Sequence, residues 1–252
     1  MSIARVYLFL SIMGFAQFGY PQQPSATEIV RRADDKMRGE KSSYSVMSMK
    51  IVRPTWERTI SFKSWGKGTE LSLVYITAPA KDKGQSFLKL NREMWSWNPS
   101  INRTIKLPTS MLSQGWMGSD FTNDDLLNQR SIVVDYTHEI VAEETVSGEL
   151  CYKISLKPKP DAPVVWGKIE MWVSKKYEII LKTEYYDEDQ YLVKSEIGKD
   201  LKDMSGRYMP TTFELIPADN EGNKTVLTID EIKFDIPIEN SFFSQQNMTR
   251  IR

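Results

Sequence analysis

The 252-residue sequence predicts a mainly β protein, a single domain built on one large curved antiparallel sheet. From Tyr44 onward apolar and polar residues alternate, as in Met47, Met49 and Ile51, and this period of two is typical of strands with one buried face. Short turn signals separate the strands, and no repeat, low-complexity tract or linker divides them. The pattern indicates about eleven to thirteen strands, and so wide a sheet tends to curl on itself.

The first regular element is a predicted helix over residues 25–38. Ser25 and Glu28 match the capping-box pattern at its start. Ile29, Ala33 and Met37 recur every four residues and form an apolar stripe along one side. We therefore expect this helix to lie flat on an apolar surface.

The remaining regular segments are predicted as strands joined by short hairpins. The first two strands contain Met47, Met49 and Ile51, and then Ile60 and Phe62. Further strands are predicted at 71–76, 86–90, 94–97, 103–107, 132–143, 152–157, 166–173, 178–186, 191–201, 208–216 and 224–234. Turn residues such as Asn98-Pro99, Ser147-Gly148 and Ser205-Gly206 separate them.

One stretch, residues 108–128, follows neither period. It places Met111, Leu112, Trp116, Met117 and Phe121 among glycines and serines, and we predict a loop with short helices. A long irregular segment that is also this apolar is usually functional. We expect it to act as a lid, with those five side chains contacting a ligand. The alternative is a loop packed permanently on the sheet.

The N-terminus has the pattern of a secretory signal peptide. Arg5 supplies a positive charge, residues 6–15 are almost wholly apolar, and Ala16 precedes a plausible cleavage point. Cleavage anywhere up to about residue 20 is compatible with this pattern. An apolar run this short is well below the roughly 20 residues that a membrane-spanning helix needs. We expect an exported, soluble chain of residues 17–252 in the periplasm.

The composition excludes several kinds of chemistry. Lys plus Arg and Asp plus Glu balance at 33 each, which argues against a nucleic-acid partner. His138 and Cys151 are the only residues of their kinds, so a histidine metal cluster or an internal disulfide is impossible. Asp120, Asp124 and Asp125 do not have EF-hand spacing. No catalytic motif appears, and we predict no enzyme activity, no metal and no cofactor.

Large, soft apolar side chains are the most distinctive feature of the sequence. Seven tryptophans and twelve methionines lie largely in the strands and the irregular segment. Any single one is most simply a core residue, but several strands are apolar on both faces, which indicates a sheet folded around a cavity. Methionine adapts to varied apolar ligands. The strand residues predicted to line this cavity are Met47, Met49, Ile51, Ile60, Phe62, Leu73, Tyr75 and Trp95.

Three segments together resemble a known family. They are residues 87–100 (Phe-Leu-Lys-Leu-Asn-Arg-Glu-Met-Trp-Ser-Trp-Asn-Pro-Ser), residues 103–108 (Arg-Thr-Ile-Lys-Leu-Pro) and residues 117–126 (Met-Gly-Ser-Asp-Phe-Thr-Asn-Asp-Asp-Leu). The chain resembles the outer-membrane lipoprotein-sorting proteins of the LolA-like superfamily, in the branch with a Met-Gly-Ser-Asp-Phe motif. This resemblance implies a LolA/LppX-like fold, an incomplete, half-open β-barrel of eleven strands around an apolar cavity, covered by helices.

The resemblance also implies a function. It is that of a monomeric periplasmic carrier, which takes the acyl chains of a lipoprotein or another lipid from an inner-membrane exporter to an outer-membrane acceptor. Two alternatives remain open: a hydrolase of envelope lipids, and a transmembrane β-barrel. Lys50, Lys63, Lys153, Lys182, Lys194 and Glu196 would interrupt the outward apolar bands that a transmembrane barrel requires.

Overall fold

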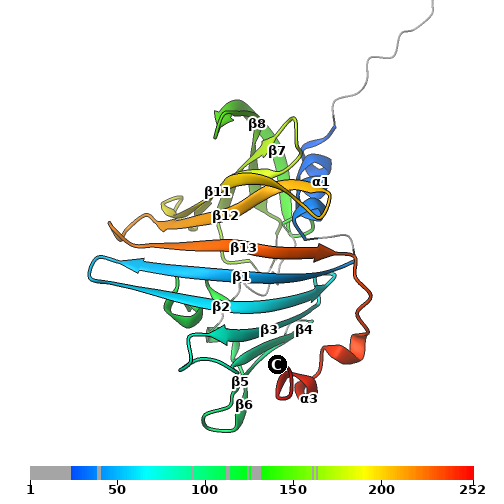
Figure 1. Ribbon diagram of the computed structural model, residues 1–252. Coiled ribbons are helices and arrows are strands. Elements are labelled where there is room, and N and C mark those ends of the chain that lie inside the picture. The colour runs from blue at the N-terminus through cyan, green and yellow to red at the C-terminus, as the bar shows by residue number, and fades with distance from the viewer. Residues whose placement is uncertain are drawn as a thin grey trace, which may run out of the picture.

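One continuous antiparallel sheet dominates the computed structural model of the protein (Figure 1), which describes residues 24–38, 41–91, 93–111, 114–123, 125, 132–160, 162 and 164–252. The sheet has thirteen strands, and the order across it is β6-β5-β4-β3-β2-β1-β13-β12-β11-β10-β9-β8-β7. It curls but does not close, since β6 and β7 remain as separate edges. The prediction of a mainly β, half-open barrel is confirmed, with thirteen strands instead of the eleven that the family resemblance implied.

Nearly all neighbouring strands follow one another in the chain. The bounds are β1 Ser42–Arg53, β2 Trp56–Lys67, β3 Leu71–Ala78, β4 Ser86–Leu90, β5 Glu93–Asn98, β6 Arg103–Lys106, β7 Tyr136–Val146, β8 Glu149–Pro158, β9 Lys168–Ser174, β10 Ile180–Tyr186, β11 Leu192–Met204, β12 Arg207–Pro217 and β13 Lys224–Phe234. The exception is the pairing of β1 with β13, in which Met47 lies opposite Ile229. This pair joins the two halves of the chain into one sheet.

The connection between β6 and β7 must cross the sheet, because these consecutive strands form its two opposite edges. We name its described residues within 108–125 the cover segment. It contains two short 3-10 helices, η1 (Thr109–Met111) and η2 (Trp116–Gly118). Trp116 and Phe121 of this segment pack with apolar side chains of β1 and β2, and Phe121 also lines a cavity, so the cover segment lies on the concave face.

The helix α1 (Ala26–Arg38) covers the other part of the concave face. Its stripe of Ile29, Val30 and Ala33 is buried against β7, β8 and β9, through residues such as Ile154 and Met171. This is the apolar contact that the sequence predicted.

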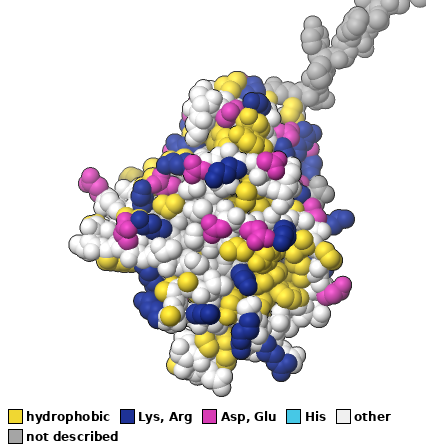
Figure 2. All heavy atoms as spheres, in the orientation of Figure 1, with side chains coloured by type: hydrophobic (Ala, Val, Ile, Leu, Met, Phe, Trp, Pro, Cys, Tyr) yellow, Lys and Arg dark blue, Asp and Glu magenta, His cyan; other side chains and the backbone are white. Residues whose placement is uncertain are grey.

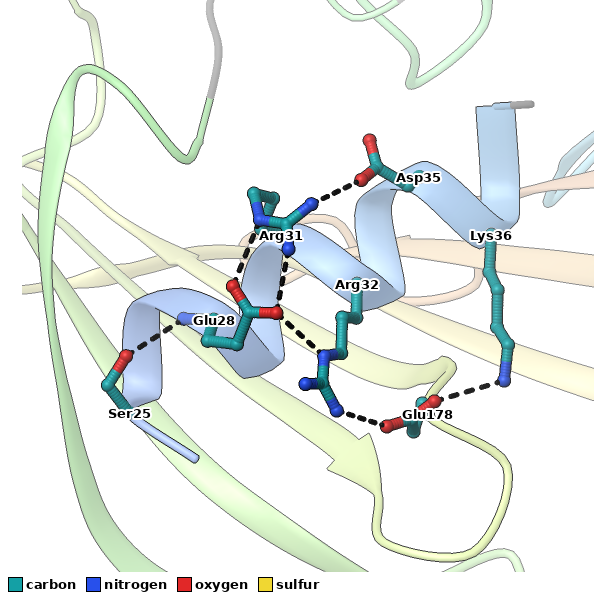
Figure 3. A network of polar contacts seen from close by, with 7 residues as sticks. All are labelled: Ser25, Glu28, Arg31, Arg32, Asp35, Lys36 and Glu178. Atoms are coloured by element: carbon teal, nitrogen blue, oxygen red, sulfur yellow. Dashed lines mark hydrogen bonds and ion pairs between the residues drawn. The ribbon is translucent and has the colours of Figure 1, made fainter. Parts of the chain in front are cut away.

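Polar contacts fix both the start of α1 and its outer side (Figure 3). The Ser25 hydroxyl accepts a hydrogen bond from the Glu28 backbone N–H, which caps the first turn. Arg32 bridges Glu28 on the helix and Glu178 in the turn before β10 (Ile180–Tyr186). Lys36 donates to the Tyr177 carbonyl oxygen. These contacts hold the helix on the sheet from its solvent side.

The strand predictions differ from the structure in one place that affects packing. Residues 132–135, predicted as the start of a strand, form a turn, and β7 begins at Tyr136. Tyr136 and Ile140 pack in the cluster under α1, but Val134 is exposed. The alternation continued through the turn by chance, and periodicity alone does not locate a strand end.

The convex face carries the C-terminal residues. After β13, the chain forms η3 (Asn240–Phe242) and α3 (Gln245–Met248), and it packs Phe243 and Met248 on Leu73 and Leu88. Figure 2 shows hydrophobic side chains gathered around this segment, with charged side chains scattered over the rest of the view. No described helix has the length and apolar character needed to cross a membrane.

Candidate functional site

A cavity of about 380 Å³ lies on the concave face of the sheet. Its lining comes from α1, from β1 to β4 and the turn between β2 and β3, from Ile132, from β9 to β13, and from Phe121 and Asp125 of the cover segment. This volume falls within the range of about 300–1,000 Å³ that is typical of small-molecule sites. The cavity is the best candidate for a ligand site among the described residues.

Small residues on one wall create this space. On the concave faces of β1, β2 and β3, the lining residues are Ser43, Ser45, Ser64, Gly66 and Ser72. They are neighbours across the strands, since Ser45 pairs with Ser64 and Ser43 with Gly66. Side chains this short cannot reach the opposite wall, so they leave a hollow.

The opposite wall is apolar. It consists of Ile169 and Met171 on β9, Phe213 on β12, and Leu227 and Ile229 on β13. The cavity is therefore mixed in character, with hydroxyl groups on one side and aliphatic and aromatic groups on the other. The sequence had predicted a wholly apolar groove.

The same strands are filled toward their other ends. There Met49, Ile51, Ile60 and Phe62 form a buried cluster with Trp116, which is 1% exposed. The Trp116 ring packs edge-on against Phe62, with 5.3 Å between ring centroids. We name this cluster the filled half of the concave face, and the region of the cavity the open half. Phe121 belongs to both, because it packs in the cluster and lines the cavity.

The Met-Gly-Ser-Asp-Phe motif, residues 117–121, fastens the cover segment to the sheet. Arg53 at the end of β1 donates to both carboxylate oxygens of Asp120 at 3.0 Å, and to the Gly118 carbonyl oxygen. The Asp120 carboxylate also accepts from the hydroxyl of the buried Thr225. Both side chains of this ion pair are mostly buried, with 14% of Arg53 and 12% of Asp120 exposed, so Asp120 serves as an anchor of the segment.

The backbone of the cover segment explains its glycines. A Cβ at Gly115 would lie 2.5 Å from the Ser119 carbonyl oxygen, which no other residue could accommodate without a shift. Gly118 has a φ of +81°, in the region that favours glycine. Both glycines allow the tight turn that brings Trp116 down onto the sheet, where its backbone N–H donates to the Phe121 carbonyl oxygen.

Two charged side chains on β11 face the cavity side of the sheet. The Lys194 ammonium is 5% exposed and contacts the Asp125 carboxylate of the cover segment at 2.5 Å. Glu196, two residues later on the same face, lines the cavity. Burial raises the pKa of the Glu196 carboxyl from 4.5 to about 7, against the opposing effect of Lys194.

The thirteen predicted ligand-binding residues fall into four groups. Met47 and Phe121 line the cavity. Met49, Ile51, Ile60, Phe62, Trp116 and Met117 belong to, or pack against, the filled half. Leu73, Tyr75 and Trp95 lie on the convex face, where Leu73 and Trp95 pack with the C-terminal segment. Met111 is 39% exposed, and Leu112 lies outside the described residues.

The two residues considered for catalysis have structural surroundings. The His138 ring, half-buried, contacts the Thr27 hydroxyl at 3.1 Å and the Ile132 carbonyl oxygen at 2.8 Å, so it ties α1 to β7. Cys151 is fully buried, and burial raises the pKa of its thiol to about 11. Such a thiol is a poor nucleophile. Over the described ranges, no group of three or more His, Cys, Asp or Glu side chains is arranged to hold a metal ion.

Sequence reasoning missed the polar part of the site. Lys194 and Glu196 had been taken as outward-facing, but both lie on the concave side. The stretch around them, Leu192 to Gly198, mixes apolar and polar residues on both faces, so it contains no signal of which face is buried.

Comparison with solved structures identifies the architecture. A DUF1329 family protein from Desulfovibrio piger matches with a TM-score of 0.79 and 24% identity, over 88% of this chain and 97% of that chain. A LolA superfamily protein from Nitrosomonas europaea matches with a TM-score of 0.76 and 24% identity, over 89% and 99% of the two chains.

A putative outer membrane lipoprotein-sorting protein domain from Vibrio parahaemolyticus also has a TM-score of 0.76, with 19% identity, over 89% of this chain and 98% of that chain. The sequence matches none of the curated proteins. A family model described as an uncharacterized protein matches residues 68–250. The chain therefore belongs to this family, and its fold is the LolA-like half-open barrel of the three solved structures.

Proposed function

We propose that the protein is a carrier that binds the acyl chains of a lipid or lipoprotein in the concave face of its sheet, without catalysis, and moves them between the inner and outer membranes. The observation that carries this proposal is the cavity, enclosed by the sheet, α1 and the cover segment, with an apolar wall of Ile169, Met171 and Phe213. Two of the similar structures, a LolA superfamily protein and a putative outer membrane lipoprotein-sorting domain, also support it.

A carrier of this kind is physically necessary for acyl chains. Each methylene gains about 0.8 kcal/mol on leaving water, so a chain of roughly 15 methylenes is held in its membrane by on the order of 12 kcal/mol. Spontaneous transfer through water is negligible on that scale. A binding site that buries the chain along most of its length removes this barrier.

The open half alone is small for such a chain, and the filled half offers the additional room. If the cover segment moves away, Met49, Ile51, Ile60 and Phe62 become a continuous apolar surface next to the cavity. The Trp116 indole N–H supports this exchange, because it is buried with no acceptor among the described residues. A buried donor without a partner costs about 1–3 kcal/mol, which reduces the stability of the covered state.

The surroundings of the candidate catalytic residues favour a carrier over the hydrolase alternative. The Cys151 thiol is inaccessible, and the contacts of the His138 ring are with Thr27 and a backbone carbonyl group. Neither side chain lines the cavity. We therefore propose binding without hydrolysis, and the experiment below also tests for hydrolysis as the alternative.

The cellular setting follows from the same proposal. The signal-like pattern of residues 1–16 lies outside the described residues, and we propose that it directs export to the periplasm, where the mature chain acts as a monomer. An inner-membrane exporter would supply the lipid and an outer-membrane acceptor would receive it. Intact mass of the exported chain tests the first step, since retention of Met1 would contradict cleavage.

A cavity-filling variant tests the carrier function directly. Ser64→Phe places a large side chain in the small wall of the cavity, so uptake of a fluorescent fatty acid should fall by about tenfold or more. Ser61→Phe is the matched control, since Ser61 lies on the same strand and faces the convex side. Binding is measured by fluorescence titration, with circular dichroism to confirm folding.

Three outcomes are informative. Loss of uptake in Ser64→Phe with normal uptake in Ser61→Phe supports the proposal. Equal uptake in the two folded variants would place the ligand elsewhere. Recovery of the fatty acid in a chemically altered form, as judged by mass spectrometry, would favour the enzyme.

A further inference from the structure

The wall of the cavity contains a carboxylate that has no partner. Glu196 lies on β11 with Gly198, and both line the cavity. Its register neighbours are Thr183 on β10 and Leu215 on β12, and Leu215 is fully buried in the filled half. Within the described part of the chain, no hydrogen bond or ion pair satisfies the Glu196 carboxylate.

The nearest cation is already engaged. The Lys194 ammonium contacts the Asp125 carboxylate at 2.5 Å, and it lies 5.0 Å from the centre of the Trp166 ring and 4.9 Å from that of Tyr185. The lysine and Asp125 neutralise one another, which leaves Glu196 as an additional negative charge. An isolated carboxylate in such surroundings is costly unless a cation or hydrogen-bond donor meets it.

The shape of the cavity puts apolar surface beside this charge. Thr183 is paired with Met171, which belongs to the apolar wall with Ile169. On the other side of β12 and β13, the serines at positions 45 and 64 line the same space with hydroxyl groups. A ligand that fits all three surfaces has an alkyl part, a positive group, and atoms that accept or donate hydrogen bonds.

We propose that the cavity recognises amphiphiles with a primary ammonium head group, and that Glu196 is the anionic contact for that group. The inference rests on the proposed function, since it assumes that the cavity binds alkyl chains, and it adds the class of head group. The alkyl chain lies against Ile169 and Met171 while the ammonium replaces water at the Glu196 carboxylate. An anionic or neutral head group leaves this carboxylate without a partner and binds less well.

Three probes with the same alkyl chain test the inference: dodecylamine, dodecanol and dodecanoate. Their affinities for the full mature chain are measured at pH 8 by displacement of a neutral fluorescent probe. We expect dodecylamine to bind about tenfold or more tightly than dodecanol, because hydrogen bonds to charged groups are the strong ones. Dodecanoate should bind the least tightly of the three.

The Glu196→Gln variant should lose this preference and still bind dodecanol. Glu214→Gln is the matched control. Glu214 is on the neighbouring strand β12, where it pairs with Ile197, and its carboxylate binds Lys199 and Lys224, neither of which lines the cavity. This variant removes the same charge from the protein without changing the lining of the cavity. Thermal unfolding of both variants establishes that they are folded.

Acidification supplies an independent readout. Since the pKa of Glu196 is about 7, lowering the pH from 8 to 6 should weaken dodecylamine binding by up to roughly tenfold, with dodecanol unchanged. The other charged or titratable groups that line the cavity or adjoin Glu196 are Asp34 of α1, Lys89 of β4, Asp125, Lys182, Tyr185 and Lys194. Glu196→Gln in the same titration separates the carboxylate from these groups.

The outcomes separate the two proposals. If none of the three probes binds the wild-type protein, the proposed carrier function fails. If dodecanol binds and dodecylamine shows no preference, or if Glu196→Gln keeps the preference, the carrier function stands and the ammonium inference is wrong.

Discussion

The filled and open halves of the concave face lie on the same strands and differ mainly in side-chain size. Along β2, Ile60 and Phe62 are buried under Trp116, and the next residues on that face, Ser64 and Gly66, line the cavity. A change from aromatic to hydroxymethyl side chains within two residues thus separates a packed core from a ligand site. The hollow is therefore determined mainly by residue size.

The halves also differ in whether their charged side chains have partners. In the filled half, the charged anchor Asp120 is fully paired with Arg53 and Thr225. In the open half, Glu196 has no such partners among the described residues, and burial raises the pKa of its carboxyl group to about 7. Complete pairing favours a stable contact, and an unpaired group favours exchange with a ligand.

The largest expected effect is a difference in the loss of unfolding free energy between variants at two positions of β2. Phe62→Ala should destabilise the protein by about 3–5 kcal/mol, because it removes a buried ring that contacts Trp116. Ser64→Ala should change stability by less than about 0.5 kcal/mol, since its side chain borders empty space. Urea unfolding measures both, and similar values for the two variants would remove the distinction between the halves.

The second expected effect concerns the anchor of the cover segment. Asp120→Asn leaves the Arg53 guanidinium without its charged partner and should cost about 2–3 kcal/mol. It should also expose Trp116, read as increased iodide quenching in a variant that retains Trp116 as its only tryptophan. Glu57→Gln, which breaks an exposed pair with Lys50, is the control and should cost less than about 1 kcal/mol.

If Asp120→Asn unfolds at the same urea concentration as wild type and its Trp116 remains equally protected, the segment is held by packing alone. An intermediate result is also informative. Loss of stability without added quenching would mean that the segment stays closed after its anchor is broken, and that it is a permanent part of the core.

The third prediction concerns pH and the open half. The folded state raises the Glu196 pKa from 4.5 to about 7, so the folded protein binds more protons than the unfolded chain between these values. Stability from this group therefore decreases as the pH rises through that window. Glu196→Gln should be more stable than wild type at pH 8, by up to about 3 kcal/mol, and the gain should disappear near pH 4.5.

Thermal unfolding of both proteins across that range provides the measurement. A constant difference between them would mean that Glu196 has a normal pKa and that the cavity is more hydrated than its lining indicates. A lower stability of Glu196→Gln at pH 8 would reveal a partner for the carboxylate.

The smallest effect is expected at the contact between α1 and β7. Burial lowers the pKa of His138 below its usual 6.5, so its contribution to stability is present above pH 6.5 and is lost as the pH falls through the lower folded-state value. In a Glu196→Gln background, which removes the opposing titration, acidification should lower the unfolding temperature. His138→Gln in the same background should reduce the dependence of the unfolding temperature on pH. If that dependence is unchanged, it arises from other titratable groups.

The sequence alone predicts some elements of the structure better than others. The period of two from Met47 to Ile51, the exact span of β13 and the capped helix at Ser25 were all recoverable, because they depend on local geometry and on burial of a single face. The irregular cover segment was also recognised, since its apolar content and missing period are properties of the chain itself. Its resemblance to a known family agrees with the fold.

Only the tertiary structure decided which face of each strand is concave. Leu73 and Trp95 were predicted inside and lie outside, because their strands are apolar on both faces and the C-terminal residues cover the convex one. Glu196 was predicted outside and lies inside, where the curvature of the sheet brings it to the cavity. Strand periodicity defines two faces but does not say which one will be concave, because that depends on the direction in which the whole sheet curls and on the side on which the cover segment packs.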